Sequence, residues 1–190
     1  MSRSLALTAE RAAQPREPQR WTVFESPLGP LTLTAGERGL SSLRFPGRGG
    51  ALAEQDRDPA PFADAAEQLE EYFAGRRQRF ELPLDAGGTS FQRRVWNELR
   101  TIPYGTTLTY TQLARLLGGP DLVRAVAGGV ARTPIPIIVP CHRVLAEDGG
   151  LTGYLGGLHR KQALLDLERD TAAGRPPRPA WAFRQLGLLG

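Results

Sequence analysis

The sequence TSFQRRVWNELRTIPYGTTLTYTQLARLLGGPDLVRAVAGGVAR, residues 89–132, decides the fold because it holds three helix signals separated by turns. Thr89 and Gln92 form a T-x-x-Q capping box, in which a hydroxyl and a side-chain amide satisfy free N–H groups at the start of a helix. Thr109 and Gln112 repeat the pattern and predict a second, shorter helix. This half of the chain is therefore expected to be mainly helical.

A third helix is predicted over residues 122–132, after a Gly-Gly-Pro turn and with Asp121 as its N-cap. Two short helices joined by a glycine-containing turn have the shape of a helix-turn-helix, whose second helix contacts DNA. That second helix is built from small residues, namely Ala125, Ala127, Gly128 and Gly129. Since each interior glycine costs about 1 kcal/mol relative to alanine, the pattern favours a helix whose backbone is closely approached by something else.

The residues before this stretch follow a different pattern. Residues 21–45 alternate between apolar and polar side chains, with turns rich in Pro and Gly, and predict a small antiparallel sheet. A loop over residues 46–60 precedes a helix that Gly75 closes, with its apolar positions at Ala65, Leu69, Tyr72 and Phe73. Residues 79–85 predict one more strand. The expected fold class is α+β.

Pattern and charge both change near residue 87, which predicts a domain boundary there. Residues 1–87 carry 11 Arg against 13 acidic residues, whereas residues 88–190 carry 12 Arg and Lys161 against 7 acidic residues. The basic second half suggests a polyanionic partner. A genome that favours Arg codons is the alternative explanation, because Lys161 is the only lysine.

The sequence is thus divided into four segments. Residues 1–19 are polar and aperiodic and are expected to be disordered. We expect an N-terminal α/β domain over residues 20–87, a mainly helical, DNA-binding domain over residues 88–170, and a C-terminal tail of unassigned role over residues 171–190.

Composition also argues against several classes of protein. No apolar run approaches the roughly 20 residues of a membrane-spanning helix, and no signal peptide is expected. The single cysteine excludes an internal disulfide and favours a reducing, cytoplasmic compartment. One Cys and two His do not make an ordinary four-ligand zinc site. We therefore expect no metal, no cofactor and no membrane, and a monomer.

The segment TPIPIIVPCHRV, residues 133–144, carries the chemistry. Its prolines exclude a helix, and its apolar run predicts a buried extended segment that delivers Cys141 and His142. A thiol needs a base to become a nucleophile. Because adjacent side chains of an extended segment point to opposite sides, the proton must pass through a bridging water or the chain must turn locally. Glu168 is a candidate to orient the imidazole. The alternative is that Cys141 is a buried small apolar residue.

Pro140-Cys-His-Arg-Val144 resembles the acceptor motif of the O6-alkylguanine–DNA alkyltransferases, also called methylated-DNA–protein-cysteine methyltransferases. Further blocks match in family order: SFQRRVWNELRTIPYG, TYTQLA, RAVAGGVA, PIPIIVPCHRV, GGLTGYLGG, LLDLE and, more loosely, SPLGPLTL. The resemblance implies DNA repair by direct reversal of damage, in a winged-helix-like domain. One alkyl group per molecule would pass from O6-alkylguanine in a flipped-out base to Cys141, and O4-alkylthymine is left open as a second substrate.

The resemblance also implies a role for each matching residue. Cys141 is the acceptor, His142 deprotonates it through a water, and Glu168 orients that histidine. Tyr110 donates a proton toward the guanine ring as the alkyl group leaves. Arg124 fills the gap that the flipped nucleotide leaves in double-stranded DNA.

Other matching residues are expected to bind or support these groups. The resemblance implies that a minor-groove DNA contact is made by Arg124, Ala125, Ala127, Gly128, Arg132 and Thr109. It implies a base pocket formed by Pro136, Val144, Tyr154, Leu155 and Gly156. Within it, backbone carbonyls of Cys141 and Val144 accept from the guanine amine, and the Leu155 N–H approaches O6. Arg143 is expected to anchor structure beneath the site.

One departure from the family pattern keeps other functions open. Thr133 stands where the family has an asparagine that ties the recognition helix to the cysteine segment, and a hydroxyl can bridge fewer groups than an amide. A non-catalytic, alkyltransferase-like sensor of alkyl lesions is the first alternative. A cysteine–histidine hydrolase or acyltransferase is the second, although the sequence offers no oxyanion loop for it.

Overall fold

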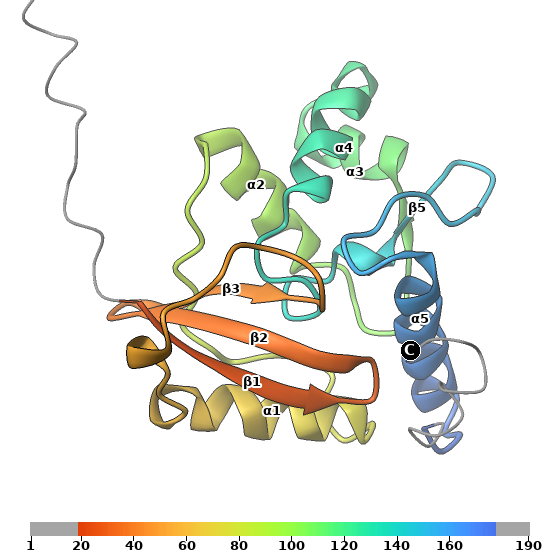
Figure 1. Ribbon diagram of the computed structural model, residues 1–190. Coiled ribbons are helices and arrows are strands. Elements are labelled where there is room, and N and C mark those ends of the chain that lie inside the picture. Colours follow the sequence, from red (N-terminus) through yellow and green to blue (C-terminus); the bar gives the residue numbers. More distant parts are fainter. Residues whose placement is uncertain (1–18, 178–190) are drawn as a thin grey trace, which may run out of the picture.

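The computed structural model describes residues 19–177. The disorder predicted for residues 1–18 and the tail beyond residue 177 lie outside the described residues. A three-stranded antiparallel sheet is formed by the N-terminal part (residues 19–88), and the C-terminal part (residues 89–177) is mainly helical, which confirms the α+β class (Figure 1). None of the described helices is long and apolar enough to cross a membrane.

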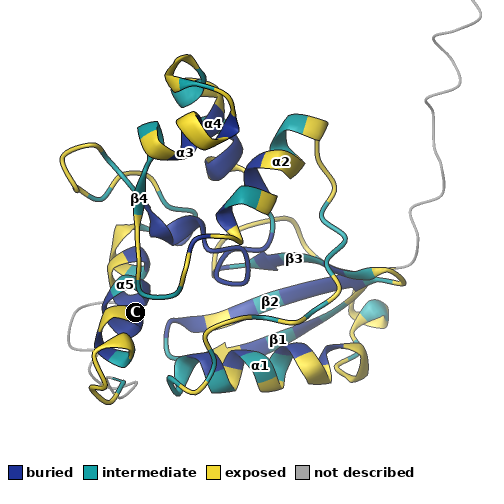
Figure 2. Ribbon diagram, turned by 180° about the vertical axis from the view of Figure 1, so that it is seen from behind, coloured by how far each residue is buried: buried dark blue, intermediate teal, exposed yellow. Residues whose placement is uncertain are grey.

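The sheet has the order β1 (Arg20–Ser26), β2 (Gly29–Gly36) and β3 (Gly39–Arg44). Alternate residues of β2 point into the core, where Leu31 and Leu33 are fully buried. Helix α1 (Ala63–Phe73) covers one face of this sheet, the helices of residues 90–131 lie beyond the opposite side, and the helix of residues 158–172 stands beside one end of the sheet (Figure 2). The sheet therefore lies between α1 and the helices of residues 90–131.

Residues 79–85 do not form the predicted strand. They run beside β3 and pair with it only around Leu40, whose N–H donates to the Pro83 carbonyl at 2.9 Å while its carbonyl accepts from the Asp85 N–H at 2.9 Å. Pro83 has no N–H for a ladder, which limits the pairing to a single bridge. The approach is so close that a Cβ at Gly39, where φ is +130°, would collide with the Pro83 carbonyl.

The C-terminal part contains four helices in the described residues: α2 (Ser90–Leu99), α3 (Tyr110–Leu117), α4 (Val123–Ala131) and α5 (Leu158–Ala172). Both predicted capping boxes are confirmed, at Thr89 with Gln92 and at Thr109 with Gln112. A short parallel pair, β4 (Leu108–Thr109) and β5 (Val144–Leu145), joins the start of α3 to the residues after Cys141.

Asp121 is not the N-cap of α4, contrary to the sequence prediction. It lies within a 3₁₀ turn, Pro120–Leu122, that runs directly into the helix, so Leu122 occupies the cap position without a side-chain bond. Proline fixes a helical φ at the start of this turn. The chain is therefore already helical at Asp121, where a capping residue would need an extended backbone.

The small residues on the inner face of α4 are explained by the close packing of this helix against α2. A Cβ at Gly129 would lie 3.0 Å from Val95 Cγ2, and Trp96 Nε1 donates to the Gly129 carbonyl at 3.0 Å. On the outer face, Arg124 and Ala125 are exposed. The small residues thus permit close helix packing on one side and leave a low, open surface on the other.

Residues 133–140 are buried, as predicted, but they are not extended. The Val139 N–H donates to the Ile135 carbonyl at 2.9 Å, and Ile137 has a φ of +76°. Prolines in this segment cannot donate to a strand ladder, and the chain folds back on itself instead. A β-branched residue in the left-handed region is strained, and tight burial holds it there.

Candidate active site

Cys141, His142 and Arg143 form a single 3₁₀ turn directly after the folded-back segment. All three are buried, with His142 fully so. This is the local turn that the sequence left open as one way to bring the thiol and the imidazole together. The turn replaces the extended geometry that would have sent adjacent side chains to opposite sides.

Glu168, on α5, is the centre of a buried hydrogen-bond network. Its Oε1 lies 2.9 Å from His142 Nε2 and accepts from Arg143 Nη2 at 2.8 Å, and its Oε2 accepts from Arg143 Nε at 2.8 Å and from the Gly105 N–H at 3.1 Å. Burial raises the pKa of Glu168, but the charges and hydrogen bonds of His142 and Arg143 outweigh burial and hold it far below its usual range. Glu168 is therefore an ionised carboxylate.

The ionised carboxylate determines the tautomer of His142. A carboxylate only accepts hydrogen bonds, so the imidazole proton sits on Nε2 and leaves the lone pair on Nδ1. Nδ1 is buried and has no partner among residues 19–177. Burial lowers the pKa of His142 even though Glu168 raises it, and the ring is neutral at neutral pH. His142 thus has an unprotonated Nδ1, and Glu168 holds its other ring nitrogen.

The thiol of Cys141 is neutral in this state. Burial raises the pKa of Cys141 to about 12, although a hydrogen bond from Thr133 and the positive charge of Lys161 lower it. A thiol with this pKa needs a base to become a nucleophile. The neutral imidazole of His142 is the base that the site offers.

Lys161 belongs to the site although the sequence analysis assigned it no role. It is fully buried, and its Nζ donates to the Val144 carbonyl at 2.6 Å and to the Thr152 carbonyl at 2.9 Å. Burial lowers the pKa of Lys161, and a negative charge on Cys141 raises it. One feature of the sequence could have indicated a role for Lys161: it is the only lysine in a chain whose other basic residues of this kind are all arginine.

Two tyrosines predicted for the site face Cys141. Burial raises the pKa of Tyr110, a hydrogen bond to Thr152 lowers it, and a negative charge on Cys141 raises it. Burial also raises the pKa of Tyr154, and a charge on Cys141 adds to that effect. The Tyr154 hydroxyl is buried without a hydrogen-bond partner in the described part of the chain, and its ring lies 6.5 Å from the His142 ring.

The other predicted pocket residues lie around the same turn and against the N-terminal part. Pro136 and Val144 are buried, and Pro136 and Leu155 line a cavity of about 200 Å³ together with residues 42–45. Gly156 packs so tightly that a Cβ there would lie 2.8 Å from the Phe45 ring. The position admits only glycine because Phe45 occupies the space of a side chain.

The predicted DNA-contacting residues are divided between two places. Arg124, Ala125 and Ala127 line one surface hollow on α4. Arg132, at the end of that helix, donates to the Gly128 carbonyl at 3.0 Å. Thr109 lies apart from these residues, at the start of α3, where its hydroxyl accepts from the Gln112 N–H at 3.2 Å as a cap.

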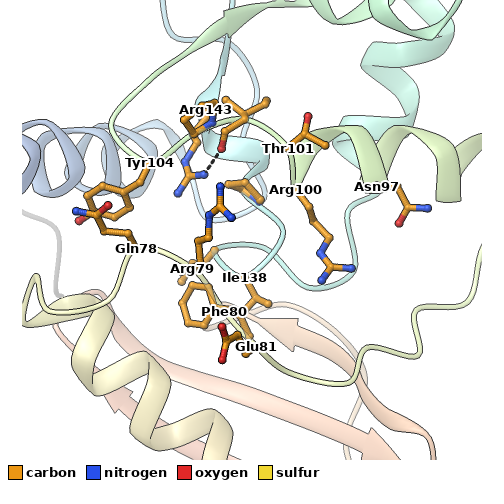
Figure 3. Close-up of a pocket in the computed structure, with 14 residues that line it drawn as sticks. Gln78, Arg79, Phe80, Glu81, Asn97, Arg100, Thr101, Tyr104, Ile138 and Arg143 are labelled. Atoms are coloured by element: carbon orange, nitrogen blue, oxygen red, sulfur yellow. Dashed lines mark hydrogen bonds between the residues drawn. The ribbon is translucent and has the colours of Figure 1, made fainter.

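Figure 3 shows a cleft between residues 78–81 of the N-terminal part and residues of the C-terminal part that include Arg100, Tyr104 and Arg143. The volume of this cleft is about 680 Å³. Arg143 borders it and donates to the Ile102 carbonyl at 2.6 Å, which ties the turn to the loop after α2. Neither Cys141 nor His142 lines this cleft. Within residues 19–177, no three His, Cys, Asp or Glu side chains gather where they could hold a metal ion.

Cys141 and His142 are adjacent in one buried turn, the histidine has a free Nδ1, and an ionised carboxylate holds its other ring nitrogen. This arrangement is typical of proteins that use a cysteine nucleophile. The family is given by comparison with known proteins. Residues 19–86 match the ribonuclease-like domain, and residues 90–170 the DNA-binding domain, of 6-O-methylguanine DNA methyltransferase. The chain belongs to the 6-O-methylguanine DNA methyltransferase family.

Similar proteins extend over most of the chain. The methylated-DNA–protein-cysteine methyltransferase of Mycobacterium bovis is 45% identical over 158 residues, which cover 80% of this chain and 93% of the relative. The constitutive protein of the same name from Bacillus subtilis is 38% identical over 163 residues, covering 78% and 94%. The crystal structure of Mycobacterium tuberculosis OGT in complex with DNA superimposes with a TM-score of 0.75 at 43% identity, covering 83% of this chain and 96% of that one.

Proposed function

We propose that this protein repairs DNA by moving the alkyl group of O6-alkylguanine onto Sγ of Cys141, once per molecule. Membership of the family and the names of its relatives support alkyl transfer from DNA to a protein cysteine. The observation that carries the assignment to Cys141 is the free, buried Nδ1 of His142, the residue that follows the neutral thiol in the same turn. An inert buried cysteine needs no such base.

The steps follow from the charges at the site. The Cys141 proton passes to His142 Nδ1 through a bridging water, and Glu168 stabilises the imidazolium that forms. Sγ then attacks the alkyl carbon, the carbon–O6 bond breaks, and its electron pair stays on the guanine. Lys161 lies close enough for its charge to stabilise the thiolate on the way. The product is a thioether, for which the site holds no group that could regenerate the thiol.

The guanine leaves more easily if it gains a proton, and Tyr110 is the residue assigned to supply it. Tyr110 remains protonated at neutral pH because burial raises its pKa. Tyr154 and Pro136 form walls of the base pocket in this proposal. The Val144 carbonyl accepts from the guanine amine, and the Lys161 ammonium group bonded to the same oxygen fixes its direction.

The DNA-binding function is assigned to α4. The helix offers a low surface of alanine and glycine that suits the minor groove, with Arg124 exposed to replace the flipped nucleotide in the duplex. Taking a base out of the stack costs a few kcal/mol, and a wedge residue offsets part of that cost. The net positive charge of residues 88–190 supports contact with phosphates. We also assign the protein to the cytoplasm, since a reactive thiol requires a reducing compartment.

The experiment that tests the function is mass spectrometry of the intact protein after incubation with a duplex that contains one O6-methylguanine. The wild type should gain one methyl group on the peptide that contains Cys141 and then stop. Cys141→Ala should bind the same duplex and gain nothing. Sustained turnover would point to a hydrolase instead, and binding without any mass gain in the wild type would point to a lesion sensor.

A further inference from the structure

Tyr72 belongs to the N-terminal part of the chain, yet its hydroxyl lies in the network around Glu168. The residue is on α1 and is fully buried. Its hydroxyl donates to Glu168 Oε1 at 2.8 Å, across 96 residues of sequence. By sequence Tyr72 falls on the apolar face of a helix, and the proposed transfer steps do not use its hydroxyl.

The ring and the hydroxyl of Tyr72 have separate surroundings. The ring packs against other aromatic rings, with centroids 5.4 Å from Phe73, 5.3 Å from Phe80 and 6.0 Å from Tyr104. A phenylalanine would make the same packing contacts. Of the Tyr72 side chain, it is the hydroxyl that bonds to the Glu168 carboxylate. Packing of the ring therefore does not explain why this residue is a tyrosine and not a phenylalanine.

The Tyr72 bond falls on the oxygen that also bonds His142. Glu168 Oε1 accepts from Tyr72, from Arg143 Nη2 and from the His142 Nε2–H, whereas Oε2 is held by Arg143 Nε and the Gly105 N–H. Burial and the charge of Glu168 raise the pKa of Tyr72 well above its usual value, and the hydroxyl therefore remains a donor. The hydrogen bond from Tyr72 thus fixes the position of Oε1 and partly neutralises its negative charge.

We propose that Tyr72 is a positioning residue for the acceptor chemistry: through its bond to Glu168 Oε1 it holds the carboxylate in place for His142 and moderates the basicity of that histidine. The N-terminal part of the chain thereby takes part in activating a cysteine that lies in the C-terminal part. This inference rests on the proposed role of His142 as the base.

The sign of the electrostatic effect can be worked out. The groups around His142 are the Glu168 carboxylate, the cations of Arg143 and Lys161 and the ring of Tyr154, and Cys141 precedes it in the same turn. Removing the Tyr72 hydroxyl leaves more negative charge on Oε1, which favours the imidazolium and raises the pKa of His142. The acid side of the pH–rate profile should then move to higher pH.

The test compares Tyr72→Phe with Tyr104→Phe. Both variants remove one hydroxyl from the same aromatic cluster, but among residues 19–177 only that of Tyr72 bonds to Glu168. Tyr72→Phe should transfer methyl groups about threefold to tenfold more slowly at neutral pH, the effect of one net hydrogen bond, and Tyr104→Phe should match the wild type. Circular dichroism and thermal unfolding check that both variants are folded.

An NMR titration of the two imidazoles supplies a readout that does not depend on activity. His142 should titrate at higher pH in Tyr72→Phe, whereas exposed His159, the only other histidine, serves as the internal reference. Slower transfer with an unchanged His142 titration would reduce Tyr72 to a packing residue, and the same shift in Tyr104→Phe would overturn the proposal as well. A wild type that transfers nothing refutes the proposed function, while the titration still decides the role of Tyr72.

Discussion

The acceptor site and the outer face of α4 are built in opposite ways. The hydrogen-bond network behind Cys141 joins residues distant in sequence: Glu168 bonds Arg143 and His142 from α5, and Tyr72 bonds Glu168 from α1. The outer face of α4 consists of a few consecutive residues, and Arg124 stands exposed on it. The chemistry thus depends on the whole fold, whereas the proposed DNA contact depends on one helix, and substitutions should separate the two.

The largest effect beyond the loss of Cys141 itself is expected from His142→Ala. Removal of a general base costs about 10²-fold to 10⁴-fold in rate. The thiol must then lose its proton to solvent, and because the pKa of Cys141 is about 12, the rate should rise about tenfold per pH unit through the alkaline range. The wild type should be flat there, since its base is already neutral above the lowered pKa of His142.

The measurement is single-turnover transfer from a methylated duplex over a range of pH. His159→Ala, which removes the exposed histidine of α5, is the matched control and should behave as the wild type. Equal pH profiles for His142→Ala and the wild type would show that the proton leaves by another route.

A smaller and more selective effect is expected from Arg124→Ala. Transfer from a lesion in duplex DNA should fall roughly tenfold, equivalent to about 1.4 kcal/mol of the flipping cost. Transfer from the free modified base should not change, because that substrate needs no flipping. Arg115→Ala removes the same charge from the exposed side of α3 and should affect the two substrates alike. Equal losses on both substrates for Arg124→Ala would make this residue part of the pocket rather than a wedge.

The smallest effect is expected at Thr133, where the acceptor segment meets the end of α4. Its buried hydroxyl donates to the Val130 carbonyl at 2.8 Å, and it lowers the pKa of the Cys141 thiol only when its single hydrogen turns from that carbonyl to the sulfur. Thr133→Val keeps the shape and should slow transfer by about threefold, the effect of part of one hydrogen bond. Thr133→Ser keeps the hydroxyl and should stay near the wild-type rate. If both variants transfer at the same rate, the hydroxyl has no role in the reaction.

Sequence patterns correctly predicted those features that depend on contacts between residues close together in the sequence. Both capping boxes were correct because a T-x-x-Q box closes within four residues. Residues 79–85 and 133–140 are less extended than predicted. Their prolines lack the N–H donors that a strand ladder needs, so these segments form single hydrogen bonds instead of a continuous ladder. Asp121 failed as a cap because the preceding proline had already started a helical turn.

The residues of the candidate site fall into two groups: those that the sequence motifs contain and those that only the folded structure brings to the site. The resemblance supplied Cys141, His142, Glu168 and Tyr110, and the structure brings these residues together. Tyr72 and Lys161 could not be assigned, because an apolar helix position and a lone lysine acquire a role only when elements far apart in sequence meet. A contact between residues so far apart in the sequence cannot be predicted from spacing or composition.

The bond between Leu43 of β3 and the Pro134 carbonyl, 2.9 Å long, also bears on modularity. In sequence terms, a fragment that starts at residue 88 would contain the cysteine, its base and its carboxylate. In the folded protein, that fragment would lose the strand edge that supports the strained turn at Ile137 and the phenol that holds Glu168. The geometry of the acceptor site therefore depends on contacts from both halves of the sequence, and a change at one side of these contacts constrains the other.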